Sequence, residues 1–398
     1  MNKYLEIFFI FFRLGCTSFG GPIAHLGYFH HEFVEKRKWL TEVAYSDLVA
    51  LSQFLPGPAS SQVGMALGSL RGGILGSLLS FLGFTLPSFF LMTSFGLGML
   101  ALGSKIPVSL LHGLQLSAVA IIIQAVWQMG NKLCPDKERI LICIGAAIIS
   151  SIVSGIIGQI FVIVFGGFIG YIFLRKIEIS PYHNVDYQIS KPLALFFLFL
   201  FLLFLFGFPI LRLFWDSNIF LLFDSFYRTG SLVFGGGHVV ISLLEDEIVA
   251  QGILSKLDFL SGYGFAQGIP GPLFTISSYI GAMNSLGING MLGAIICSVA
   301  AFLPAYFLIL GILPFWNSIR KFKVMLYMMS GINAAVVGLL LSVLYDLLYK
   351  ETVINTFDFY LLLIAVILLQ KWKLPSWMVL VLTTTICYSK DLVLIYIK

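Results

Sequence analysis

The stretch LSQFLPGPASSQ (residues 51–62) places two prolines, a glycine, three serines and two glutamines inside a chain that is 59% hydrophobic. A similar stretch, AQGIPGPLFTISS, follows at residues 266–278. Proline lacks a backbone N–H and glycine favours conformations outside the helix, so each proline-glycine-proline (PGP) segment interrupts a helix. The sequence therefore predicts two broken helices, with their pieces at about 43–71 and 258–288.

The composition indicates an integral membrane protein. Charged residues make up 11% of the 398 residues, whereas soluble domains contain roughly 25%. Apolar stretches recur along the chain at roughly the 20 residues that a helix needs to cross a bilayer. The stretch LALFFLFLFLLFLF (residues 193–206) does not alternate apolar and polar residues as a membrane β-strand would. We therefore expect an all-α, polytopic helical bundle in a cell membrane, the cytoplasmic membrane of a bacterium.

The two halves of the chain repeat each other. FFRLGCTSFGG (residues 11–21) matches FYRTGSLVFGG (residues 226–236), which aligns Arg13 with Arg228. The two PGP segments align at almost the same offset, with Gly57 opposite Gly271. So constant an offset predicts two homologous repeats, each with one broken or re-entrant helix.

Three regions follow from this match. We assign the first repeat to residues 1–175, a linker with one hydrophobic span to residues 176–218, and the second repeat to residues 219–398. The loop HHEFVEKRKWL (residues 30–40) is basic, whereas its counterpart LLEDEIVAQG (residues 243–252) is acidic. Because basic loops tend to stay in the cytoplasm, this exchange of charge favours repeats of inverted orientation.

Broken helices at equivalent positions of two repeats are typical of substrate sites in transporters. A helix that starts after a break presents unpaired N–H groups and the positive end of its dipole, and both favour an anion. Serine, threonine and glutamine side chains beside the PGP segments add neutral hydrogen-bond donors. Kinking of a helix for packing alone is the alternative explanation of these segments.

Two arginines add to the anion hypothesis. Arg13 and Arg228 lie inside apolar stretches, where an arginine costs at least ~2.5 kcal/mol. Each precedes a glycine-rich break, which can bring backbone amides close to a ligand. The planar guanidinium suits a tetrahedral oxyanion that is bound through two oxygens. The alternative is a structural ion pair, of Arg13 with Glu6 and of Arg228 with Asp224.

These features define a candidate site shared by the two repeats. The predicted substrate-binding residues are Arg13, Gly20, Gly21, Gln53, Gly57, Ser60, Ser61, Gln62, Arg228, Gly235, Gly236, His238, Gln267, Gly271 and Thr275. The predicted helix-breaking residues are Pro22, Pro56, Pro58, Pro270 and Pro272. His25 and Asp47 are candidate proton-coupling groups.

Other kinds of site have little support in the sequence. Five cysteines are scattered without CxxC pairing, and the six histidines show no metal-ligand spacing. No metal or cofactor is therefore expected. No basic domain suggests nucleic acid as a partner, so an oxyanion and membrane lipid are the expected partners, and the oligomeric state stays open.

Long motifs carry a resemblance to a known family. FGGPIAHLGYFHHEFVEKRKWL (residues 19–40), LVALSQFLPGPASSQVGMALGSLRGG (residues 48–73) and AQGIPGPLFTISSYIGA (residues 266–282) resemble the chromate ion transporter (CHR) family in its two-domain long form. The resemblance covers almost the whole chain. It implies export of chromate from the cytoplasm, with sulfate as competitor or counter-ion, and hence chromate resistance.

Elementary energetics agrees with export. An interior-negative potential favours outward movement of a dianion by about 4.6 kcal/mol per 100 mV, and the sequence contains no GxxxxGK[ST] loop for a nucleotide. One alternative is a cation-coupled importer of a sulfate- or molybdate-type oxyanion, which would use acids such as Asp47, Asp224 and Asp258. A membrane-embedded enzyme is a weaker alternative, because its only acidic cluster would be residues 245–247.

Overall fold

The computed structural model describes residues 2–153, 155–175, 189–215, 217–234, 240–348 and 352–397. Within these residues every regular element is a helix, which confirms the predicted all-α fold class. The first half contains α1 (Lys3–Thr17), α2 (Gly21–His30), α3 (Glu42–Phe54), α4 (Ala59–Leu102), α5 (Val108–Leu133), α6 (Lys137–Ile152) and α7 (Gly155–Phe173). After α8 (Lys191–Phe214) come α9 (Asn218–Leu232), α10 (Val240–Leu244), α11 (Lys256–Gly268), α12 (Ile276–Met283), α13 (Gly290–Ile312), α14 (Trp316–Ile319), α15 (Lys323–Asp346), α16 (Thr356–Gln370) and α17 (Ser376–Ile397).

The described helices suit a membrane. Five stretches are long and apolar enough to cross one: α4, α5, α8, α13 together with α14, and α15. The chain is thus a multi-pass membrane protein, as its composition predicts. Only 11% of the most apolar part of α8 is buried within the protein. This helix therefore presents most of its surface to lipid.

Both PGP segments end one helix and begin another. In the first half α3 stops at Phe54, and α4 begins at Ala59 after the break. In the second half α11 stops at Gly268, and the short 3-10 turn Leu273–Thr275 leads into α12. Neither helix continues through the PGP segment, because its two prolines lack the backbone donor and the glycine between them has a positive φ.

The helix after the first PGP segment folds back on itself. Gly72 and Gly73 have non-helical backbone angles, so α4 consists of two helices on either side of them. A Cβ on Gly76 would lie 2.3 Å from the carbonyl oxygen of Gly68, which shows that the two pieces pack against each other. The piece from Ala59 to Arg71 spans roughly 20 Å, which is too short to cross a hydrocarbon core of ~30 Å.

The two halves repeat the same packing. α1 packs along α4, and α9 packs along α13. A Cβ on Gly15 would meet the carbonyl oxygen of Phe84 at 2.6 Å, and a Cβ on Gly230 would meet that of Ala301 at 2.2 Å. Glycine permits this close approach of helix backbones, as is common between membrane helices.

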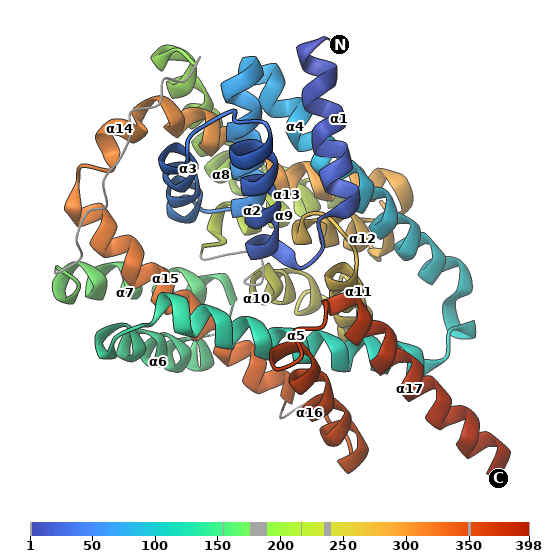
Figure 1. Ribbon diagram of the computed structural model, residues 1–398. Coiled ribbons are helices and arrows are strands. Elements are labelled where there is room, and N and C mark those ends of the chain that lie inside the picture. Colours follow the sequence, from blue (N-terminus) through green and yellow to red (C-terminus); the bar gives the residue numbers. More distant parts are fainter. Residues whose placement is uncertain are drawn as a thin grey trace.

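Figure 1 shows how the remaining helices are arranged around the pairs α1–α4 and α9–α13. The N-terminal helix α1, in dark blue, lies at the top of the view, and the chain ends beyond α17, in red, at the lower right. α5 packs against α11, α15, α16 and α17, while α6 and α7 pack against α15. α8 covers α9 and α13.

Candidate functional site

The glycine of each PGP segment donates a backbone hydrogen bond to a carbonyl oxygen of the other half. The N–H of Gly57 donates to the carbonyl oxygen of Val233 at 2.6 Å, and the N–H of Gly271 donates to that of Ser18 at 3.0 Å. Ser18 ends α1 and Val233 ends α9, and these two positions align at the same offset as Arg13 and Arg228. The contact therefore occurs twice, with the halves exchanged. We call this pair of contacts the PGP crossing.

Glycine is required at the centre of each PGP segment. Gly57 has a φ of 120° and Gly271 a φ of 98°, a region that residues with a Cβ rarely adopt. A Cβ on Gly57 would lie 2.9 Å from Nε2 of Gln62, and a Cβ on Gly271 would lie 2.5 Å from Oγ of Ser88. Both the backbone conformation and the available space thus exclude larger residues.

Buried polar groups of the first half surround the crossing. The imidazole of His25 lies between Ser18 and Ser60, with Nε2 3.2 Å from the Ser18 carbonyl oxygen and Nδ1 3.3 Å from Oγ of Ser60. Because a carbonyl oxygen only accepts, Nε2 carries the proton, and in the neutral ring Nδ1 accepts from the Ser60 hydroxyl. His25 thus joins α2 to the end of α1 and to the start of α4.

Some polar atoms beside the crossing have unused hydrogen-bonding capacity. Gln62 donates through Nε2 to the Pro56 carbonyl oxygen at 2.7 Å, which fixes the PGP backbone. The Gln62 Oε1 atom and the Ser18 and Ser61 hydroxyls are buried, and among the described residues they have no hydrogen-bond partner. A buried polar group without a partner is costly. These atoms are therefore suited to a ligand or water.

The corresponding hydroxyls of the second half are already engaged. Thr275 donates to the Pro272 carbonyl oxygen at 2.7 Å, and Ser277 donates to that of Phe274 at 2.7 Å. Ser278 donates to the Thr275 carbonyl oxygen at 2.8 Å. Among these hydroxyls that follow the PGP segments, Ser61 of the first half is therefore the one without a partner in the described residues, although Ser225 and Thr229 of α9 are also buried without one.

Each of the two arginines lies beside an equivalent glutamate of its own half. Arg13 lies 2.7 Å from Glu32, and Arg228 lies 3.6 Å from Glu247. Both glutamates are buried, on the π-helical turns His31–Lys36 and Glu245–Val249, and they align at the same offset as the arginines. Neither glutamate was among the predicted site residues. Their shared offset was the signal that could have found them.

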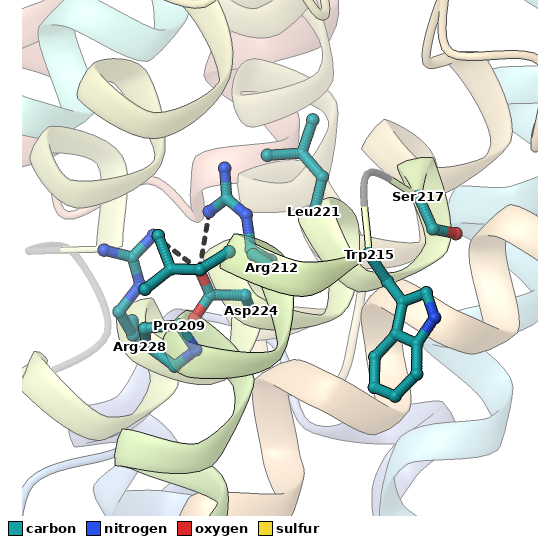
Figure 2. A pocket seen from close by; sticks show the side chains of 8 residues that line it. Pro209, Arg212, Trp215, Ser217, Leu221, Asp224 and Arg228 are labelled. Atoms are coloured by element: carbon teal, nitrogen blue, oxygen red, sulfur yellow. Dashed lines mark hydrogen bonds and ion pairs between the residues drawn. The ribbon is translucent and has the colours of Figure 1, made fainter.

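Of the two ion pairs that the sequence suggested for the arginines, the structure contains one. Arg228 lies 2.9 Å from Asp224, so that ion pair is confirmed, and Arg212 of α8 binds the same carboxylate at 2.6 Å (Figure 2). The pairing of Arg13 with Glu6 is wrong. Glu6 lies 3.2 Å from Arg37 instead, because the basic loop folds back over the start of α1.

Glu32 lies outside the candidate membrane spans, and its ion pairs predict a pH dependence. Burial disfavours its charged form, but a hydrogen bond from Arg37 and the charges of Arg13, Arg37 and Lys36 outweigh this and lower the pKa below its ordinary value. A lowered carboxyl pKa stabilises the fold above the ordinary value of 4.5, and this contribution is lost as the pH falls below it. We expect Glu32→Gln to unfold at a higher pH than the unaltered protein when both are titrated with acid in detergent. Glu35→Gln, which alters an exposed carboxyl nearby, is the control and should shift the midpoint much less.

Three other predicted residues take part in neither hydrogen bond of the PGP crossing. Asp47 of α3 forms a buried ion pair with Arg320, which follows α14 in the other half. Gln53 lines an open groove of about 450 Å³ that also contains Lys132. Gln267 is buried in α11.

The glycine segments are only partly described. Gly20 and Gly21 have positive φ angles of 97° and 75° and start α2, with Pro22 in its first turn. Gly235, Gly236 and His238 lie outside the described residues. Among the described residues, no group of three His, Cys, Asp or Glu side chains could hold a metal ion.

Comparisons with known proteins agree with the duplicated architecture. The profile of the chromate transporter family matches residues 5–171 and again residues 220–388. A chromate transport protein of Pseudomonas aeruginosa is 27% identical over 352 residues, which are 87% of this chain and 81% of that protein. One from Cupriavidus metallidurans is 25% identical over 371 residues, 92% of this chain and 88% of its own length. An uncharacterized transporter of Methanocaldococcus jannaschii is 25% identical over 343 residues, 85% of this chain and 83% of its own.

No solved structure matches the chain. The family profile instead covers both halves of the chain and leaves out α8, the apolar helix between them. Two matched regions, several membrane-spanning helices and a PGP segment in each half form one consistent description. The chain belongs to the chromate transporter family.

Proposed function

We propose that the protein exports chromate, a tetrahedral dianion, from the cytoplasm through the PGP crossing. The observation that carries the proposal is the crossing itself, where two broken helices meet beside buried hydroxyls with unused hydrogen-bonding capacity. Family membership supports the substrate, because relatives of this chain carry the name chromate transport protein. Transport rather than catalysis agrees with these names.

Neutral donors and helix ends are suited to this cargo. The Ser18 and Ser61 hydroxyls can donate to the oxygens of a tetrahedral anion, and the helix that begins at Ala59 directs its positive end to the same place. Donors of this kind bind an anion without the strong charge that would keep it bound. A transported anion must leave the site as readily as it enters.

The arginines supply positive charge on either side of the crossing. Arg13 lies five residues before Ser18, and Arg228 lies five residues before Val233, so each is on the helix that delivers a carbonyl to a PGP glycine. In our proposal each arginine exchanges its glutamate for the anion as the anion approaches. Lysine at either position would keep the positive charge but would lack the planar guanidinium that can bind two oxygens of the anion.

The membrane potential sets the direction. A dianion gains about 4.6 kcal/mol per 100 mV on leaving an interior that is negative. Export therefore needs no other energy source, whereas import would need coupled cations. The three acids that such coupling would require are engaged: Asp47 with Arg320, Asp224 with two arginines, and Asp258 with Ser255 at the start of α11.

Labelled chromate uptake into inside-out vesicles tests the proposal. We expect accumulation when the lumen is made positive and its loss when the potential is collapsed. Sulfate on the outside should compete, and sulfate in the lumen should accelerate uptake if it is a counter-ion. Movement that follows a cation gradient and ignores the potential would contradict export and favour the cation-coupled importer of sulfate or molybdate.

Removal of the Ser61 hydroxyl tests where the anion binds. Ser61→Ala deletes a buried hydroxyl that has no partner among the described residues, so stability should be unchanged or higher. Loss of a hydrogen bond to a charged ligand should weaken the apparent affinity for chromate about tenfold. The control is Ser277→Ala, since that hydroxyl is already bound to the Phe274 carbonyl oxygen. A weakened affinity in the control variant alone would move the site to the second half.

A further inference from the structure

A second polar pocket lies between α8 and α9, on the α8 side of Arg228, the second-half arginine of the proposed anion path. Its volume is about 270 Å³. Figure 2 shows Arg212 and Arg228 directed at the carboxylate of Asp224, with Trp215 on the turn that follows α8. α8 belongs to neither of the two regions that match the family profile.

The charged groups of this pocket leave one acceptor and one donor unused. Oδ2 of Asp224 lies 2.6 Å from Nη1 of Arg212 and 2.9 Å from Nη2 of Arg228. Oδ1 of Asp224 and Nε of Arg228 are buried and have no hydrogen-bond partner among the described residues. Asp224 is only 1% exposed, so bulk water does not satisfy its free oxygen. An occupant with both a cationic donor and an anionic acceptor would complement these atoms.

The surroundings of the pocket point to lipid as the source of that occupant. α8 spans roughly 36 Å, which exceeds the ~30 Å of the hydrocarbon core, so Arg212 in its last turn lies near the membrane surface. Leu213, Phe214 and Trp215 follow at once and are 81%, 75% and 60% exposed. Exposed tryptophan beside apolar residues is typical of the membrane interface. Basic pockets between membrane helices are known to bind phospholipid headgroups.

We propose that the pocket binds a phospholipid whose headgroup carries a primary ammonium, such as phosphatidylethanolamine. The phosphate accepts from Nε of Arg228 and from the Arg212 guanidinium, and the ammonium donates to Oδ1 of Asp224. The acyl chains lie along the exposed apolar surface of α8. The bound lipid would thereby hold α8 against the second repeat at α9.

Native mass spectrometry of the full chain in detergent tests this site directly, because it measures bound lipid and not transport. Phosphatidylethanolamine, phosphatidylcholine and phosphatidylglycerol are added in separate samples. We expect phosphatidylethanolamine to bind about tenfold more tightly than the other two, since choline has no N–H and glycerol has no charge to offer Asp224. Equal binding of the three lipids would overturn the proposal.

Arginine variants place the lipid in the pocket. Arg212→Ala should lower the affinity for phosphatidylethanolamine about tenfold. The matched control is Arg175→Ala, which removes an arginine that lies beyond α7 and stacks 5.1 Å from the ring centre of Tyr171. The affinity of the control should equal that of the unaltered protein. Arg212→Lys keeps the charge opposite Asp224, so it should give an intermediate affinity even if the alanine variant fails to fold.

Two further results would count against the lipid. Unaltered phosphatidylethanolamine affinity in Arg212→Lys and Arg212→Ala would show that the phosphate does not bind Arg212. Inorganic phosphate provides the other test, in protein stripped of lipid. Phosphate binding that depends on Arg212 and that phosphatidylethanolamine does not displace would make the pocket a site for a soluble oxyanion.

Discussion

Gly271→Ala is expected to abolish chromate transport and to destabilise the protein. The alanine would need a φ near 98°, which costs of order 1–3 kcal/mol for a residue other than glycine. Its Cβ would also lie 2.5 Å from Oγ and 2.9 Å from Cβ of Ser88. The segment must therefore move, and the hydrogen bond from Gly271 to the Ser18 carbonyl oxygen would be lost. Transport in vesicles and thermal unfolding in detergent measure the two effects.

Two variants separate strain at the crossing from a general effect of alanine. Gly98→Ala places a methyl group in α4 where nothing lies within 4 Å, and in a helix this should stabilise by roughly 0.5–1 kcal/mol. Adding Ser88→Gly to Gly271→Ala removes the contact but keeps the unfavourable φ, so we expect partial recovery. Full transport by Gly271→Ala alone would show that the PGP crossing is not part of the path.

Arg320→Ala is expected to cost about 3–5 kcal/mol of stability, because it leaves the Asp47 carboxylate buried without its partner. The pair joins α3 of the first half to the end of α14 in the second, and both side chains are at most 10% exposed. Thermal unfolding in detergent measures the loss. Lys321→Ala alters the exposed neighbour and should change the stability by less than about 0.5 kcal/mol.

A double-mutant cycle shows whether the pair acts as a unit. Asp47→Asn combined with Arg320→Gln removes both charges, so the double variant should be more stable than the sum of the single losses predicts. The cycle also tests Asp47 as a proton carrier. If the double variant retains a pH-dependent transport rate, then Asp47 serves the structure and does not carry the coupling proton.

The sequence by itself was enough for the architecture. Low charge and apolar stretches of bilayer length indicate a membrane protein. Its spans should be helices, because every backbone polar group must be paired within the hydrocarbon. The breaks at the PGP segments were equally predictable, because two prolines flank a glycine there, whereas single prolines such as Pro87 and Pro304 stay inside helices. The alignment of Arg13 with Arg228 disclosed the duplication, which the family profile then matched in both halves.

The candidate site could be predicted only in part. Residue type identifies Gly57 and Gly271 as positions that need conformational freedom, but it does not reveal that each binds a carbonyl of the other half. Nor does it show which hydroxyls are unused, because a serine in a helix can donate to its own backbone, as Ser277 does, or remain available, as Ser61 does. That choice depends on neighbours distant in the sequence.

Charge pairing between different helices was decided by the tertiary structure, whereas the pair of Arg228 with Asp224 within α9 was predicted from the sequence. In an apolar stretch an arginine needs a partner, and the sequence suggested Glu6 for Arg13 and Asp224 for Arg228. Packing brought Glu32 to Arg13, gave Glu6 to Arg37 and added Arg212 of the linker helix to Asp224. Composition and periodicity thus fix helices and their breaks, because these depend on local backbone chemistry. Ion pairs and unused polar atoms depend on which helices meet, which only the folded chain determines.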